Sequence, residues 1–84
     1  MDALDGNAIA GALFEHFGTE MTTATGACRH CGAAAQIATL QVYARGPGDV
    51  VRCPSCGGVV MVLVTIRGVT RVNLDGFELL ESAL

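Results

Sequence analysis

The stretch CPSCGG, residues 53–58, decides the fold, and CRHCG, residues 28–32, repeats its cysteine spacing. Within each stretch two residues separate two cysteines, so one tight turn aims both sulfurs at a single ion. A hairpin in the 21 residues between the pairs would bring the two halves of a tetrahedron together. The pattern predicts a four-cysteine metal site composed of Cys28, Cys31, Cys53 and Cys56.

Zinc is the metal that this pattern favours, because Zn²⁺ accepts four thiolates without redox change or a preferred distortion. Gly32 and Gly57 follow the pairs directly, and glycine there can take positive φ, which curls the chain and points backbone N–H groups at the sulfurs. Pro54 stiffens the second turn. We therefore expect one structural zinc ion per chain, with all four positions filled by protein.

Three other interpretations of the cysteines compete with zinc. A rubredoxin-like iron centre uses similar turns, and four thiolates also suit iron, although few aromatic residues are present to shield it. Disulfides are disfavoured if the thiols stay reduced. A thioredoxin-like redox pair needs a CxxC that opens a helix, whereas strands are predicted after both pairs. Iron remains the alternative metal.

Composition indicates one small domain spanning residues 1–84. A chain of 84 residues buries a limited core and is expected to need a cross-link, such as a metal site, for stability. Hydrophobic residues make up 51% and charged residues 15%, which is too apolar for a disordered chain. All five basic residues are arginine and the formal net charge is −3. Nucleic acid is therefore an unlikely partner, because its binders normally carry a basic footprint.

The ends and the apolar runs indicate a cytoplasmic protein with no membrane association. The first eleven residues, MDALDGNAIAG, contain two aspartates and no basic residue, unlike a secretory signal. The longest apolar run, residues 59–64, is too short to span a bilayer.

The flanking segments predict an α+β fold: a zinc ribbon with a three- to four-stranded antiparallel sheet, an N-terminal helix and a short C-terminal helix. Asp5 caps a predicted helix over 5–17, with its apolar stripe at Ile9, Leu13, Phe14 and Phe17; Gly18 ends it. The ribbon covers 28–74. Its strands are predicted at 36–45, 50–52, 59–66 and 69–74, with turns at 46–49 and 67–68. Residues 75–84 are predicted as the second helix.

The strand VVMVLVTI, residues 59–66, is apolar on both faces. A strand in a sheet with one solvent-exposed face would alternate apolar and polar residues. We therefore expect both faces of the sheet at residues 59–66 to be covered. The N-terminal helix can cover one face, and the C-terminal segment is the only remaining lid for the other. Because that lid is short, we expect apolar surface to remain for a second copy of the chain or for a partner.

Catalytic machinery is not evident in the sequence, and we expect no enzyme activity. No activated nucleophile, paired acid and base, or cofactor loop is recognisable. His30 lies inside the first cysteine turn and is expected to be an exposed residue rather than a ligand. Arg29, His30 and Arg52 neighbour the site and are expected to offset the charge of a tetrathiolate zinc centre.

The stretches MDALDGNAIAGALFEHFGTEMT and VVRCPSCGGVVMVLV resemble a family of small uncharacterised bacterial proteins, domain of unknown function 6510. The resemblance covers nearly the full length. It implies a metal-binding fold and no established activity.

The preferred function is a zinc-binding protein that acts as a protein–protein interaction or accessory module, with an unknown protein or a second copy as partner. The alternatives are a nucleic-acid-associated ribbon that serves transcription or translation and, with less support, an iron-containing electron carrier.

Overall fold

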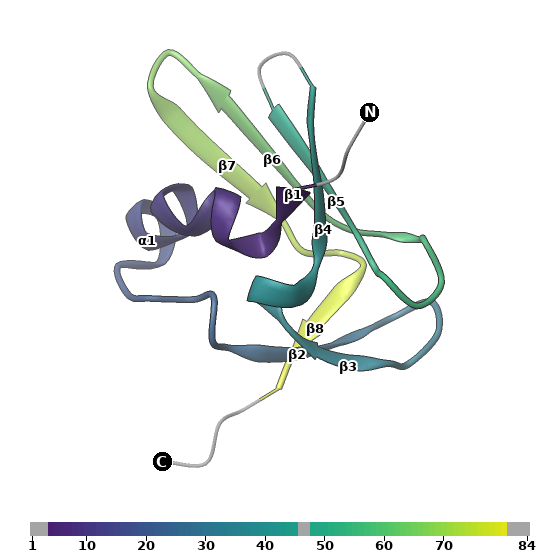
Figure 1. Cartoon of the computed structure of the whole chain (residues 1–84). Coiled ribbons are helices and arrows are strands. Elements are labelled where there is room, and N and C mark those ends of the chain that lie inside the picture. The colour runs from purple at the N-terminus through teal and green to yellow at the C-terminus, as the bar shows by residue number, and fades with distance from the viewer. Residues whose placement is uncertain (1–3, 46–47, 81–84) are drawn as a thin grey trace.

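The computed structural model describes residues 4–45 and 48–80 and consists mainly of strands in two antiparallel sheets (Figure 1). The elements in chain order are β1 (Leu4–Asp5), the 3₁₀-helix η1 (Gly6–Ile9), α1 (Ala10–Phe17), β2 (Thr25–Cys28), β3 (Ala34–Gln36), the 3₁₀-helix η2 (Ile37–Thr39), β4 (Gln41–Arg45), β5 (Gly48–Arg52), β6 (Val59–Ile66), β7 (Val69–Asn73) and β8 (Phe77–Leu79).

The larger sheet has five strands in the order β1-β4-β5-β6-β7. Its longest strand, β6, has the bounds predicted from the sequence, and a two-residue turn joins it to β7. Arg67 and Gly68 in that turn have φ of 54° and 77°, the pair of positive values that a type I′ hairpin turn requires. The predicted turn at 46–49 lies partly outside the described residues, and β5 already begins at Gly48.

The N-terminal helix is shorter than predicted because its first turn is a 3₁₀-helix. Asp5 caps that turn by accepting a hydrogen bond from the backbone N–H of Asn7 at 3.0 Å. Gly18 ends α1 with φ of 75° and donates its N–H to Phe14 O. Leu13 is completely buried, whereas Phe14 is 54% exposed. The predicted apolar stripe was therefore wrong at Phe14, which lies on the solvent side of the helix.

The C-terminal segment is a strand and not the predicted helix, so the fold-class prediction was wrong. Residues 77–79 form β8, which pairs with β2, while β3 pairs with the other edge of β2. Phe77 is buried opposite Cys28, and Leu80 N–H bonds Thr25 O at 2.9 Å. Pairing with β2 satisfies backbone groups that a free helix of this length would leave to water. Residues 81–84 of the predicted helix lie outside the described residues.

The predicted strand 36–45 is interrupted by the 3₁₀-helix η2. Leu40 N–H bonds Ile37 O, and the Thr39 hydroxyl bonds Gln36 O, which closes a turn before β4 begins. The turn allows Ile37 and Leu40 both to be buried, each with 1% exposure. In an unbroken strand over 36–45, Ile37 and Leu40 would lie on opposite faces of the sheet. The prediction therefore missed the bend that lets both side chains reach the core.

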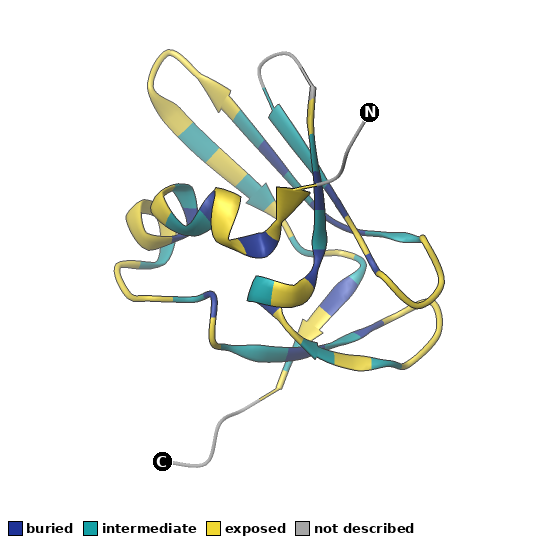
Figure 2. Cartoon of the chain, in the orientation of Figure 1, coloured by how far each residue is buried: buried dark blue, intermediate teal, exposed yellow. Residues whose placement is uncertain are grey.

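The core lies between α1 and one face of the larger sheet and extends to the smaller sheet (Figure 2). It contains Ile9, Leu13, Ile37, Leu40, Val42, Val51, Val60, Met61, Leu63 and Phe77, together with Cys28 and Cys53. Two of the four cysteines are thus part of the core. Within the described residues, no helix has the length and apolar character needed to cross a membrane.

In place of the predicted α+β ribbon with three or four strands and two helices, the described chain has eight strands in two sheets and one short α-helix. The smaller sheet, β3-β2-β8, was not anticipated. Its strands are only three or four residues long, too short for a clear alternating pattern.

Candidate metal centre

Two turns of nearly identical geometry carry the four cysteines, and we call them the first knuckle (residues 28–32) and the second knuckle (residues 53–57). In the first knuckle Gly32 N–H bonds Cys28 O, and in the second Gly57 N–H bonds Cys53 O, both at 2.8 Å. Gly32 and Gly57 have φ of 80° and 77°, values that favour glycine over residues with a side chain. The predicted role of both glycines is confirmed.

The four sulfurs lie together, all within 4.8 Å of one another. The Sγ atoms of Cys28 and Cys56 are 3.7 Å apart, and those of Cys31 and Cys53 are also 3.7 Å apart. A tetrahedral zinc ion with Zn–S bonds of about 2.3 Å requires S–S edges of about 3.8 Å. All four cysteines are free thiols. The cluster therefore has the composition and nearly the dimensions of a site that can hold a metal ion.

Backbone N–H groups point at the sulfurs, as expected for thiolate ligands. His30 N–H donates to Cys28 Sγ and Ser55 N–H to Cys53 Sγ, both at 3.3 Å, and Gly58 N–H donates to Cys56 Sγ at 3.4 Å. These donors stabilise negative charge on sulfur without adding a competing ligand.

The pKa values of the thiols reflect this balance. Burial opposes ionisation of Cys53, but N–H groups of Cys56 and Ser55 and the adjacent sulfurs outweigh it and lower its pKa to about 7. The pKa of Cys28 is also lowered, against burial, by the N–H groups of Cys31 and His30. At Cys31 an N–H bond from Ala33 lowers the pKa, but burial and three neighbouring sulfurs together raise it to about 11. A coordinated metal ion would deprotonate all four.

His30 links the first knuckle to Gly58 and Val59, directly after the second knuckle, a role that was not predicted from the sequence. Its Nε2 lies 3.0 Å from Val59 O, and because a carbonyl oxygen only accepts, Nε2 must carry the proton. The ring also lies against Gly58, where an added Cβ would come within 2.7 Å of His30 Cδ2. His30 is exposed, as predicted, but it is not a free surface residue. The glycine after the second knuckle was the only sequence signal for this contact.

The cysteine cluster lies where the two sheets meet. Cys28 is the last residue of β2 in the smaller sheet, and Cys53 follows β5 of the larger sheet. Arg52 closes the second knuckle by donating from Nη1 to Gly57 O at 2.7 Å, so its guanidinium lies beside the centre. A metal ion bound by all four sulfurs would therefore link the sheets through a single point.

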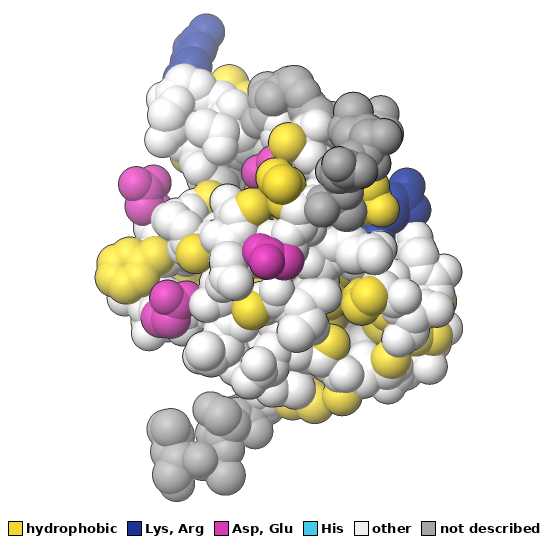
Figure 3. Space-filling view, viewed as in Figure 1, with side chains coloured by type: hydrophobic (Ala, Val, Ile, Leu, Met, Phe, Trp, Pro, Cys, Tyr) yellow, Lys and Arg dark blue, Asp and Glu magenta, His cyan; other side chains and the backbone are white. Residues whose placement is uncertain are grey.

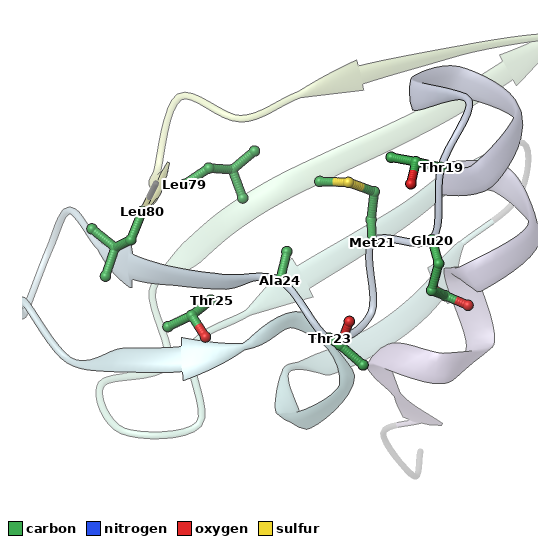
Figure 4. A pocket seen from close by; sticks show the side chains of 8 residues that line it. All are labelled: Thr19, Glu20, Met21, Thr23, Ala24, Thr25, Leu79 and Leu80. Carbon is green, nitrogen blue, oxygen red and sulfur yellow. The ribbon is translucent and has the colours of Figure 1, made fainter. Parts of the chain in front are cut away.

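A separate groove of about 800 Å³ lies between the α1–β2 loop and the end of β8 (Figure 4). Apolar groups and threonine hydroxyls line it, from Thr19, Glu20, Met21, Thr23, Ala24, Thr25, Leu79 and Leu80. The carboxylate of Glu20 accepts bonds from the N–H and hydroxyl of Thr22, which lower its pKa. No cysteine or histidine lines the groove, and its one carboxylate is engaged, so its described residues provide no acid–base pair.

Comparison with known proteins gives a family and no further relative. No curated protein and no solved structure matches the chain significantly. One family model matches residues 1–84, the whole sequence, and its description is a family of unknown function (DUF6510). The chain belongs to this family.

Proposed function

We propose that the four cysteines bind one zinc ion whose role is structural. The observation that carries this proposal is the set of four free thiols with cross-knuckle sulfur distances of 3.7 Å. Binding to such sites contributes on the order of 10 kcal/mol at neutral pH. A chain of 84 residues is typically stable by about 4–13 kcal/mol in total. Loss of the metal should therefore remove most of the stability of the fold.

The scaffold that this ion holds together serves, in our proposal, as a protein–protein interaction or accessory module. The supporting feature is the face of the larger sheet opposite α1, which we call the open face. Tyr43, Val50 and Val62 lie side by side on it, and Ile66 lies opposite Val69. None of these residues is fully buried, and Ile66 and Val69 are 59% and 60% exposed.

The C-terminal segment was the predicted lid for the open face, but β8 pairs with β2 instead. In the described part of the chain this face therefore combines apolar side chains with polar ones, Arg71 beside Val64 and Asn73 beside Val62, and has a hollow of about 640 Å³ along β6 and β7. On the α1 side, Figure 3 shows several separate hydrophobic patches among carboxylates, backbone and other side chains. Contiguous apolar surface on one face is typical of a docking site.

Other features agree with a binding role rather than catalysis. A zinc ion with four protein ligands has no open position for water or substrate. The net charge of −3 disfavours nucleic acid as the partner, and reduced cysteines at metal-ligand spacing favour the cytoplasm.

The interaction role is tested with Ile66→Glu, which places a charge on the open face at an exposed position. Ala8→Glu adds the same charge at an exposed position on η1 and is the control. Light scattering over a concentration series and capture from an extract of the native cells should show association for the wild type and for Ala8→Glu, and its loss for Ile66→Glu. A wild-type chain that stays monomeric and captures nothing would refute the proposed role.

A further inference from the structure

Two of the four cysteines of the metal centre are exposed to solvent and two are buried. Cys28 and Cys53, the first cysteine of each knuckle, are 2% and 3% exposed because they end or follow strands that face the core. Cys31 and Cys56, the second cysteine of each knuckle, are exposed. The accessibility of a thiolate largely decides which cysteine meets a soluble oxidant first.

Each exposed sulfur has a buried sulfur of the other knuckle beside it. Cys31 Sγ lies 3.7 Å from Cys53 Sγ, and Cys56 Sγ lies 3.7 Å from Cys28 Sγ. A disulfide has an S–S bond of about 2.05 Å, so a movement of less than 2 Å, on that basis roughly 1.7 Å, would close either pair. Each exposed cysteine thus has, in the other knuckle, a buried thiol close enough to resolve it once it is oxidised.

We propose that hydroperoxides oxidise this centre through Cys31 or Cys56, releasing the metal and forming one cross-knuckle disulfide, Cys31–Cys53 or Cys28–Cys56. The inference rests on the proposed metal binding. It adds a modification site and a condition under which the site gives up its ion.

The chemistry balances with hydrogen peroxide as the oxidant. The exposed thiolate attacks one peroxide oxygen, the O–O bond breaks, and hydroxide leaves a cysteine sulfenic acid behind. The neighbouring thiolate then attacks the sulfenic sulfur, which forms the S–S bond and expels a second hydroxide. One peroxide accepts the two electrons that the two thiolates lose. The site then retains only two thiolates and releases the ion, because a structural zinc site needs four ligands.

The position of these disulfides gives oxidation a specific consequence. Either bond joins the first knuckle to the second and so keeps β2 and β5 linked after the metal has gone. The oxidised chain can then be reduced by thiols and reloaded without passing through a fully separated state. A disulfide within one knuckle would leave the two sheets unlinked.

The test uses the wild-type chain purified with its metal, so no cysteine variant has to fold. One equivalent of hydrogen peroxide is added while a metallochromic dye reports released metal. Free thiols are alkylated, the chain is digested with trypsin, and disulfide-linked peptides are identified by mass spectrometry. Arg29 lies between Cys28 and Cys31, so cleavage separates these cysteines, and fragment ions distinguish Cys53 from Cys56.

We expect loss of one metal ion per peroxide consumed, with Cys31–Cys53 or Cys28–Cys56 as the product. In a parallel experiment without oxidant, iodoacetamide should label Cys31 and Cys56 before Cys28 and Cys53. Retention of the metal after stoichiometric oxidation, disulfides within a knuckle, or earlier labelling of the buried pair would overturn the inference. A chain that is purified folded and without metal would instead contradict the proposed metal binding itself.

Discussion

Replacement of His30 by alanine should separate a bridging role from a ligand role. The change removes the bond from Nε2 to Val59 O and the contact between the ring and Gly58. A hydrogen bond of this kind contributes about 0.5–1.5 kcal/mol. In a domain of 60–100 residues, 1 kcal/mol corresponds to a shift in Tm of about 4–8 °C. We therefore expect His30→Ala to lower Tm by several degrees and to leave the metal content unchanged.

The assay is thermal unfolding followed by circular dichroism at saturating metal, with elemental analysis of the same samples. His16→Ala removes an exposed histidine from α1 and is the control, with an expected effect within about 0.5 kcal/mol. Gly58→Ala provides a second test, because its Cβ would displace the His30 ring. Gly58→Ala should destabilise the fold less when His30 is already alanine. The coupling energy between the two substitutions should then be about 0.5 kcal/mol or more, which is the lower limit for residues in contact.

Two results would refute this reasoning. If His30→Ala lost its metal stoichiometrically, His30 would be a ligand and the four-cysteine assignment would be wrong. If Tm did not change and the two substitutions were additive, His30 would not link the first knuckle to Gly58 and Val59.

Three further predictions concern the fold around the centre. Leu13→Ala should lower the free energy of unfolding by about 2–5 kcal/mol in denaturant titration, because Leu13 is completely buried. Phe14→Ala, at a 54% exposed position, should lower it by less than about 1 kcal/mol. Equal losses would show that α1 packs on the core through another face. Gly26→Ala should cost about 1–3 kcal/mol, since its Cβ would meet the buried Phe77 ring, and an unchanged Tm would contradict that contact. Gly11→Ala in α1 should stabilise by about 0.5–1 kcal/mol, because nothing lies within 4 Å of the added Cβ; a lower denaturation midpoint would contradict the helix.

Sequence reasoning located the knuckles well because their geometry is local. Two residues between cysteines, followed by glycine at positive φ, specify a turn without help from the rest of the chain. The same holds for β6, whose eight residues are strongly β-forming, and for Gly18 at the end of α1.

Tertiary pairing decided the elements that were predicted wrongly. Phe77 and Leu80 have helical spacing, but β2 offers an unpaired edge, and β8 pairs with it. The alternation of apolar, polar and apolar residues over Phe77–Leu79 is visible in the sequence, but three residues are too few to outweigh a helical pattern. Burial of both Ile37 and Leu40 interrupted the predicted strand for the same reason: the core, not the local pattern, set the direction of the chain.

The hydrogen bond from His30 to Val59 O joins residues that are 29 positions apart, and no local sequence pattern predicts such a contact. The register of the β6–β7 hairpin, however, can be predicted from the sequence. The two-residue turn at Arg67 and Gly68 places Leu63 opposite Val72, as the turn type requires.

The central claim is that a zinc ion bound by Cys28, Cys31, Cys53 and Cys56 holds the two sheets together. The most direct measurement is elemental analysis of the purified chain, combined with an NMR spectrum before and after removal of the metal by a chelator. We predict one zinc per chain, and loss of the dispersed spectrum when the zinc is removed. A chain that contains no metal, or that keeps its dispersed spectrum after the metal has been removed, would contradict the claim.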